Sequence, residues 1–179
     1  MEAPLGLSEG YCAAAFLDRD GVLTEDTGYP RRLSDTRLVA GAAEAVAWLN
    51  RQGFACVVVT NQSGVARGYF TEADVQRFHR EMHQAFAAQG ARLDAFYYCP
   101  FHPQASVEAY RADHRDRKPA PGMIERAARE LGVRMARSFL IGDKPSDLGA
   151  ARAAGIPGFM FKGGNLRDFV QSLPLAVKV

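Results

Sequence analysis

The sequence predicts an α/β fold, a doubly wound parallel sheet, and three observations support this class. Short apolar runs alternate along the chain with longer amphipathic segments, the order expected of alternating strands and helices. The apolar runs are nearly continuous, as in strands that are buried on both faces. Most of them end at polar residues or at a helix-breaking proline. Strands joined by helices in this way are expected to be parallel, because each helix returns the chain to the same end of the sheet.

Five segments are predicted as strands because they are short, apolar and bounded by glycine, proline or polar residues. The run at residues 54–59 is the clearest, since three valines follow one another in it. The predicted strands are residues 13–17, 54–59, 94–99, 138–142 and 158–161.

Five other segments are predicted as helices from their apolar stripe and from residues that begin or end helices. Thr71 and Asp74 match a capping box, and Pro121 suits the first turn of a helix. Ser146 is expected to cap the helix that follows it. The predicted helices are residues 41–51, 71–89, 121–131, 146–154 and 165–173.

The totals predict one domain over residues 1–179, with a loose leader at residues 1–11. A formal net charge of +2 gives no reason to expect nucleic acid or a membrane surface as partner. The three cysteines, Cys12, Cys56 and Cys99, suggest no disulfide framework, so a reducing cytoplasm is expected. No segment has the charge pattern of a signal peptide or the length of a membrane span.

Two acids one residue apart, Asp18 and Asp20, follow the first predicted strand, and Gly21 lets the chain turn away. The carboxyl ends of parallel strands are where such sheets bind ligands. One carboxylate there can attack an electrophile or hold a cation while the other moves protons. The alternative is an acidic surface turn, because Asp and Gly are common turn residues.

Other polar residues are expected at the same edge, since Thr60 and Asn61 follow the second strand and Asp143 follows the fourth. Lys118 lies just before a predicted helix. Taken one at a time, these residues also fit a helix cap, a turn and a solvated lysine. Their joint placement after successive strands is the argument for a site.

This set of residues suits phosphate-ester chemistry with Mg²⁺, which prefers a few hard oxygen ligands. Asp18, Asp143 and the carbonyl of Asp20 are candidate ligands. Asp18 is the candidate nucleophile that forms an aspartyl-phosphate, and Asp20 is the candidate acid and base. Thr60 is expected to bind phosphoryl oxygens, and Lys118 to stabilise the charge of the transition state.

The chain resembles the haloacid-dehalogenase-like phosphatase superfamily, whose four motifs match Asp18 to Gly21, Thr60, Lys118 and Asp143. It resembles in particular the D,D-heptose 1,7-bisphosphate phosphatase and histidinol-phosphatase family. The strings that carry this likeness are FLDRDG at 16–21, VTNQSGVARG at 59–68, YYCP at 97–100 and RKPAPGM at 117–123.

The resemblance implies Mg²⁺, no large cap domain, and a monomeric cytoplasmic enzyme that acts on a small phosphorylated metabolite. Heptose 1,7-bisphosphate, losing its 7-phosphate, is the implied substrate, within lipopolysaccharide biosynthesis. The resemblance also implies that a set of residues binds the sugar phosphate, namely Asp26, Thr27, Gly28, Tyr29, Asn61, Gln62, Ser63, Arg117 and Lys144.

The chain departs from the family at a structural zinc site, which the resemblance places in the loop of residues 99–118. The family has a Cys-x-His pair and a Cys-x-Cys pair, and here the matching residues are Cys99, Phe101, His114 and Asp116. Phe101 cannot bind zinc, and a closed site needs four ligands. His102 is the candidate substitute. We expect no zinc and a loop held by packing instead. Because this loop is expected to recognise the far end of the substrate, a substrate other than heptose bisphosphate stays open as an alternative.

Two other functions remain open at the level of sequence. Histidinol phosphate or another small phosphorylated metabolite is an alternative substrate. A phosphatase fold that binds a partner without chemistry is the alternative class, but the joint presence of Asp18, Asp20, Lys118 and Asp143 argues against it. The sequence shows no basic face that would favour a nucleic-acid phosphatase.

Overall fold

A computed structural model describes residues 13–175, so the leader expected at residues 1–11 lies outside the described residues. The described chain contains a parallel sheet of five strands, in the order β3-β2-β1-β4-β5. The strands are β1 (Ala13–Leu17), β2 (Phe54–Asn61), β3 (Ala95–Cys99), β4 (Phe139–Gly142) and β5 (Gly158–Met160). The predicted doubly wound α/β class is confirmed.

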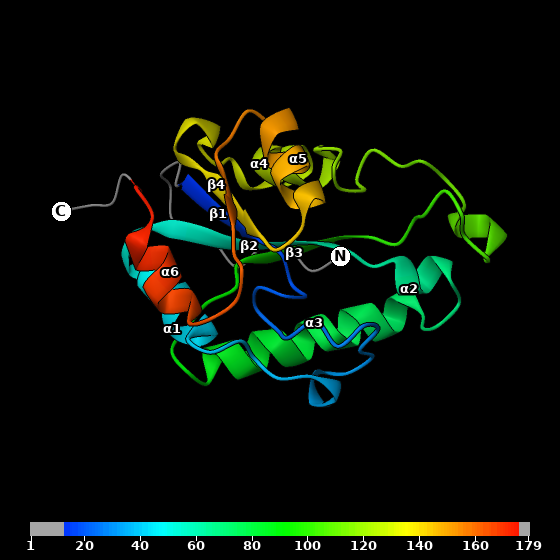
Figure 1. Ribbon diagram of the computed structural model, residues 1–179, viewed down its shortest axis with the longest axis horizontal. Helices are drawn as coiled ribbons and strands as arrows, with labels where there is room; N and C mark the ends of the chain where they lie inside the picture. The colour runs from blue at the N-terminus through cyan, green and yellow to red at the C-terminus, as the bar shows by residue number, and fades with distance from the viewer. Residues whose placement is uncertain (1–12, 176–179) are drawn as a thin grey trace.

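Helices cover both faces of the sheet, as Figure 1 shows, with α1, α3 and α6 on one face and α4 and α5 on the other. A short helix, α2, follows β2 and lies beside the turn formed by residues 108–110. The helices are α1 (Ala42–Arg51), α2 (Ser63–Ala66), α3 (Glu72–Ala87), α4 (Gly122–Leu131), α5 (Pro145–Ala153) and α6 (Leu166–Ser172).

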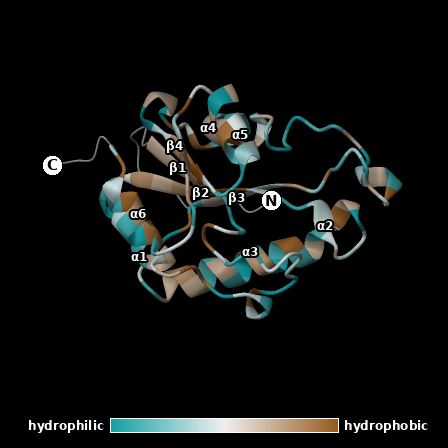
Figure 2. Ribbon diagram, viewed as in Figure 1, coloured by the Kyte–Doolittle hydropathy of each residue, from teal (hydrophilic) through white to brown (hydrophobic). Residues whose placement is uncertain are grey.

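The two faces of the sheet carry separate hydrophobic cores because successive strand residues point in opposite directions. In β1, Ala15 and Leu17 pack into the core under α1 and α3, whereas Ala14 and Phe16 pack into the core under α4 and α5. All four side chains are fully buried. Figure 2 shows the same arrangement, with hydrophobic strands at the centre and a largely hydrophilic chain in the long loop before α4.

The order of the strands creates a switch point between β1 and β4. The chain runs outward from β1 through β2 to β3, then crosses to the other side of β1 and continues through β4 to β5. Loops therefore leave β1 and β4 in opposite directions at their carboxyl ends, which is where ligands bind in folds of this type.

Most predicted elements lie within one or two residues of their observed bounds, but the cap predicted at Ser146 is wrong. Helix α5 begins at Pro145, after Lys144, and the backbone N–H of Lys144 donates to the side chain of Asp147. The capping box of Thr71 and Asp74 is confirmed. None of the helices among the described residues is long and apolar enough to span a membrane.

Candidate active site

The first two acids of the site meet because β1 and β4 are neighbouring parallel strands. Leu17 pairs with Ile141 at the ends of the two strands, and the backbone N–H of Asp18 donates to the carbonyl of Ile141 at 2.9 Å. Asp18 and Asp143 thus follow their strands directly, one on each side of the switch point. The structure brings together two acids that are distant in the chain.

A third acid, Asp147, joins them from the first turn of α5. Oxygen atoms of Asp18, Asp143 and Asp147 all lie within 4.8 Å of one another, and no other such set of metal-ligating side chains occurs among residues 13–175. Two glycines make this approach possible. A Cβ on Gly21, whose φ is +91°, would lie 2.2 Å from Asp143 Oδ2, and one on Gly142 would lie 2.1 Å from Asp147 Cβ.

Asp143 has the character of a cation ligand. Its Oδ1 is buried and has no hydrogen-bond partner among the described residues. Burial, and then the neighbouring charge of Asp18, raise the pKa of Asp143 to about 6. A bound cation would give this oxygen the partner that it lacks and would relieve the repulsion between the carboxylates. Mg²⁺ prefers hard oxygen ligands of this kind. The residues present therefore fit a divalent cation such as Mg²⁺.

Lys118 is buried against the same cluster. Its Nζ lies 2.9 Å from Asp18 Oδ1 and 2.5 Å from Asp147 Oδ1, and it donates to the carbonyl of Val59 at 2.8 Å. Burial alone would lower the pKa of Lys118, but the two carboxylates outweigh it and the pKa is raised. A permanent positive charge therefore lies beside Asp18.

The backbone of Lys118 is held by Asn61, the last residue of β2. The Asn61 amide donates to the Lys118 carbonyl and accepts from the Lys118 N–H, both at 3.0 Å. These two bonds fasten the 99–118 loop to the sheet. The side chain of Asn61, which the resemblance assigns to the substrate, is therefore engaged with the protein in this structure.

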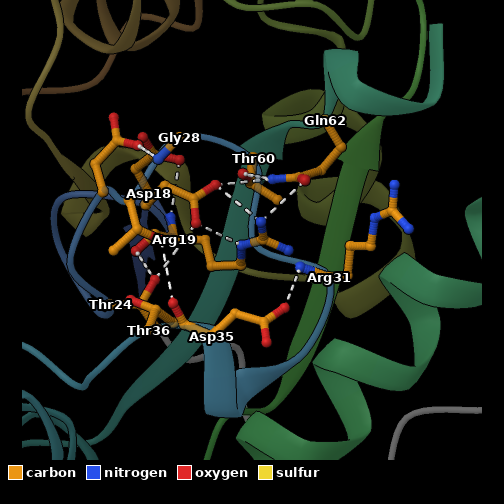
Figure 3. A network of polar contacts seen from close by, with 12 residues as sticks. Asp18, Arg19, Thr24, Gly28, Arg31, Asp35, Thr36, Thr60 and Gln62 are labelled. Carbon is orange, nitrogen blue, oxygen red and sulfur yellow. Dashed lines mark hydrogen bonds and ion pairs between the residues drawn. The ribbon is translucent and has the colours of Figure 1, made fainter. Parts of the chain in front are cut away.

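Asp20 lies in a hydrogen-bond network with Arg19, Gln62 and Thr60. Figure 3 labels the last three of these residues. Arg19 contacts both carboxylate oxygens of Asp20, at 3.0 and 2.9 Å. Gln62 joins Asp20 to Thr60, and Thr60 and Gln62 are 1% and 3% exposed. The Gln62 side chain is thus also engaged within the protein.

The rim of the site is formed by more exposed residues from three loops. Lys144 Nζ donates to Asp26 Oδ2 at 2.9 Å, so two residues assigned to the substrate by resemblance pair with each other. Tyr29 and Tyr69 stand edge to face at 4.8 Å and are both nearly half exposed. Other rim residues singled out from the sequence are the exposed Thr27 and Gly28 and the partly buried Ser63 and Arg117.

The 99–118 loop does not bring the four zinc candidates together as a ligand set. The ring of Phe101 stacks on His114 at 4.4 Å, with an interplanar angle of 15°. Asp116 accepts from Arg126 at 2.7 Å, and His102 accepts from the backbone of Gln104. Cys99 is buried and forms no disulfide, and its Sγ lies 3.9 Å from the carbonyl oxygen of Phe101. These residues do not fit a structural zinc ion.

Sequence reasoning missed two residues of the site, Asp147 and Arg19. Asp147 carried no signal beyond that of an acid in the first turn of the helix that follows Asp143. Arg19 carried none. An arginine between two acids is ordinarily exposed, but here it is 1% exposed.

The comparisons with known proteins agree on one family. A family model described as HAD-hydrolase-like matches residues 116–171. A D-glycero-β-D-manno-heptose-1,7-bisphosphate 7-phosphatase of Rhodopseudomonas palustris is 47% identical over 160 residues, which are 89% of this chain and 89% of that protein. The protein of the same name from Escherichia coli K12 is 46% identical over 80% of this chain and 75% of its own length.

The chain belongs to this phosphatase family of HAD-like hydrolases. Solved structures support the assignment. A putative HAD-like phosphatase from Mesorhizobium loti is 34% identical with a TM-score of 0.83, over 90% of this chain and 79% of that one. The D,D-heptose 1,7-bisphosphate phosphatase of B. bronchiseptica, described as complexed with magnesium and phosphate, is 34% identical with a TM-score of 0.75, over 91% and 88%. As a member of the family, the chain is a phosphoric monoester hydrolase.

Proposed function

We propose that this chain is a Mg²⁺-dependent phosphatase that removes the 7-phosphate from D-glycero-D-manno-heptose 1,7-bisphosphate, with residues 1–179 forming one domain. The observation that carries the proposal is the buried Lys118 beside Asp18, within an acidic cluster that fits a divalent cation. The names of the relatives supply the substrate. A monomer in the cytoplasm that acts on a small metabolite, with no nucleic acid or membrane partner, is part of the same proposal.

The proposed reaction has two steps. An oxygen of Asp18 attacks phosphorus and forms an aspartyl-phosphate, while Asp20 gives a proton to the departing sugar oxygen. Asp20 then takes a proton from water, which attacks the aspartyl-phosphate and releases inorganic phosphate. Lys118 and the hydroxyl of Thr60 stabilise charge on the phosphoryl oxygens.

The cation would be held by carboxylate oxygens of Asp18 and Asp143, with the carbonyl of Asp20 as a further candidate. When bound, Mg²⁺ neutralises the repulsion between the anionic nucleophile and the phosphate ester. Asp147 contacts Lys118 and the backbone of Lys144, so its role is to hold the lysine and the start of α5 in place.

A second phosphate suits the outer part of the site because two arginines, Arg67 and Arg117, lie near each other and neither forms an ion pair among residues 13–175. Burial, and among other charges the nearby positive charge of Arg67, lower the pKa of the half-buried Arg117. The Nε of Arg67 is buried without a hydrogen-bond partner among the described residues. The 1-phosphate of a bisphosphate would satisfy both guanidinium groups. Histidinol phosphate carries an amine at its far end, which these charges would repel.

The deciding experiment is a panel of phosphate esters assayed with Mg²⁺, with heptose 1,7-bisphosphate and histidinol phosphate side by side. The bisphosphate is expected to have the highest kcat/KM. Replacing Arg117 with Met should raise its KM by about tenfold or more while changing turnover of a small monophosphate little. A preference for histidinol phosphate would contradict the substrate assignment.

A matched variant tests the nucleophile. Asp18→Asn should lower phosphate release by about a thousandfold or more while the protein stays folded, because the amide cannot attack phosphorus. Full activity in this variant would contradict the mechanism. Failure of the wild-type protein to release phosphate from any ester would favour a binding module instead.

A further inference from the structure

Arg19 is a buried cation placed between two residues of the proposed reaction. Its side chain is 1% exposed, and its guanidinium lies over the ring of Phe78 at 4.2 Å. Nε and Nη2 donate to the two oxygens of Asp20, at 3.0 and 2.9 Å. Nη2 also donates to Gln62 Oε1 at 2.9 Å. The Arg19 side chain therefore contacts the candidate acid, Asp20, and the amide of Gln62 beside it.

These contacts fix which way the amide of Gln62 points. A guanidinium only donates, so the atom that faces Arg19 must be the amide oxygen. The amide nitrogen then faces Asp20 Oδ2 at 3.0 Å and Thr60 Oγ1 at 2.9 Å. Figure 3 shows Gln62 pointing toward Thr60. Both hydrogens of the amide nitrogen are used by these two contacts. The carboxylate of Asp20, which accepts, favours the same orientation.

The orientation of Gln62 in turn decides what Thr60 can do. Thr60 Oγ1 accepts from Gln62, so the single hydrogen of its hydroxyl is free, and no described residue accepts it. Thr60 lies at the end of β2, next to the strand that leads to Asp18. The hydrogen is therefore available to a phosphoryl oxygen at the nucleophile.

We propose that Arg19 is a positioning residue, which acts through Gln62 to fix the Thr60 hydroxyl as a hydrogen-bond donor to the phosphoryl group. The proposal rests on the proposed phosphatase function. The same guanidinium binds the carboxylate of Asp20, so Arg19 fixes the position of both the Thr60 hydroxyl and the acid. The hydrogen bonds form a series in which Arg19 donates to Gln62 and Gln62 donates to Thr60.

The test reverses the direction of the hydrogen bond between Gln62 and Thr60 with a side chain of nearly the same shape. In Gln62→Glu, a carboxylate can only accept, so the Thr60 hydrogen turns away from the phosphoryl group. The value of kcat is expected to fall by about 100-fold or more, as on loss of one transition-state donor. Calorimetry should show weaker binding of inorganic phosphate in the presence of Mg²⁺, a readout that needs no turnover.

A double-mutant cycle with Thr60→Val separates this effect from the added negative charge. If Gln62 acts through Thr60, Gln62→Glu should cost less than about threefold in the Thr60→Val background, for kcat and for phosphate binding alike. Equal losses in the two backgrounds would overturn the proposal. If the wild type hydrolyses no ester but phosphate binding follows the cycle, the proposed function fails and this inference stands.

Arg19→Lys tests whether Arg19 is the residue that fixes the orientation of Gln62. Lysine keeps the charge but lacks the planar fork that reaches Asp20 and Gln62 together. We expect kcat to fall at least about tenfold with KM nearly unchanged, since the loss lies in the transition state. A folded Arg19→Lys protein with wild-type kcat would overturn the proposal, and Gln62→Glu serves as the test if that variant does not fold.

Discussion

Lys118 and Asp147 form an ion pair that is almost completely buried, with Nζ and Oδ1 2.5 Å apart and side chains 3% and 1% exposed. The same ammonium lies 2.9 Å from Asp18. A lysine buried among acids is stable only while its partners are charged, and the acids depend equally on the lysine. This relationship ties the stability of the fold to the site itself.

Replacing Lys118 with Met should therefore damage both stability and activity. Asp18 and Asp147 would be left buried without their cation, which is expected to lower the free energy of unfolding by about 3–5 kcal/mol. Phosphate release should fall with it, because the charge beside the nucleophile is gone. Denaturant unfolding and the phosphate assay measure the two effects.

The double variant Lys118→Met with Asp147→Asn is the control. It removes one of the uncompensated charges, so it should regain part of the lost stability and none of the activity. A Lys118→Met protein as stable as the wild type would show that the buried pair does not contribute as argued.

The second prediction concerns the cation. Asp143→Asn removes the charge from the oxygen that lacks a partner, so Mg²⁺ affinity measured by calorimetry should fall about tenfold or more. Mutating even a residue that only hydrogen-bonds a metal ligand lowers metal affinity by about 10–100-fold. Asp168→Asn, at an exposed acid on α6, is the matched control and should bind as the wild type does. Equal Mg²⁺ affinity in the two variants would exclude Asp143 as a ligand.

The third prediction is that the 99–118 loop keeps its shape without zinc. Added zinc or a chelator should leave the Tm unchanged, whereas Phe101→Ala should lower stability by about 1–2 kcal/mol through loss of the stack on His114. Metal analysis of the purified protein with one zinc per chain would contradict this.

A gain-of-site variant completes that test. Phe101→His, His114→Cys and Asp116→Cys together supply three ligands that join Cys99 to make four. This triple variant should bind zinc and become sensitive to chelators, which the wild type is not expected to be. If it binds no zinc, the loop geometry and not the ligand set is what excludes the metal.

The fold and the residues at the strand ends were predictable because both depend on local pattern and chain order. Apolar runs identify β1 and β4, and parallel strands bring the residues that follow them, Asp18 and Asp143, to one edge. Lys118 has no such local signal. It was singled out by its place just before a predicted helix and by its likeness to a family motif, and the structure places it through Asn61, which binds its backbone.

The remaining residues were not predictable because their environment comes from distant parts of the chain. Arg19 is buried only because Phe78 of α3 covers it and Gln62 accepts from it. Asp147 looked like an ordinary acid in the first turn of a helix, where the helix dipole favours negative charge. Its contact with Lys118 depends on the loop before α4, whose path the sequence does not specify.

The last prediction concerns acid sensitivity, and it follows from His79 on α3. Its ring stacks on Phe96 at 4.7 Å, lies edge-on to Tyr98 and is buried, with Nε2 lacking a hydrogen-bond partner among the described residues. Burial, and then the positive charge of Arg19, hold the pKa of His79 well below its usual value of 6.5. The unfolded chain therefore binds a proton at this position that the folded protein does not.

Stability should consequently fall as the pH drops below about 6.5, because protonation then favours the unfolded state. Between pH 7 and pH 5.5 this histidine alone should cost about 1 kcal/mol of the free energy of unfolding. In His79→Phe, which can keep the contact with Phe96, the pH dependence of denaturant unfolding should be smaller by that amount. His83→Gln, at a less buried histidine of the same helix, is the control for removing a histidine from α3. Equal slopes for the wild type and His79→Phe would mean that His79 takes up its proton in the folded protein.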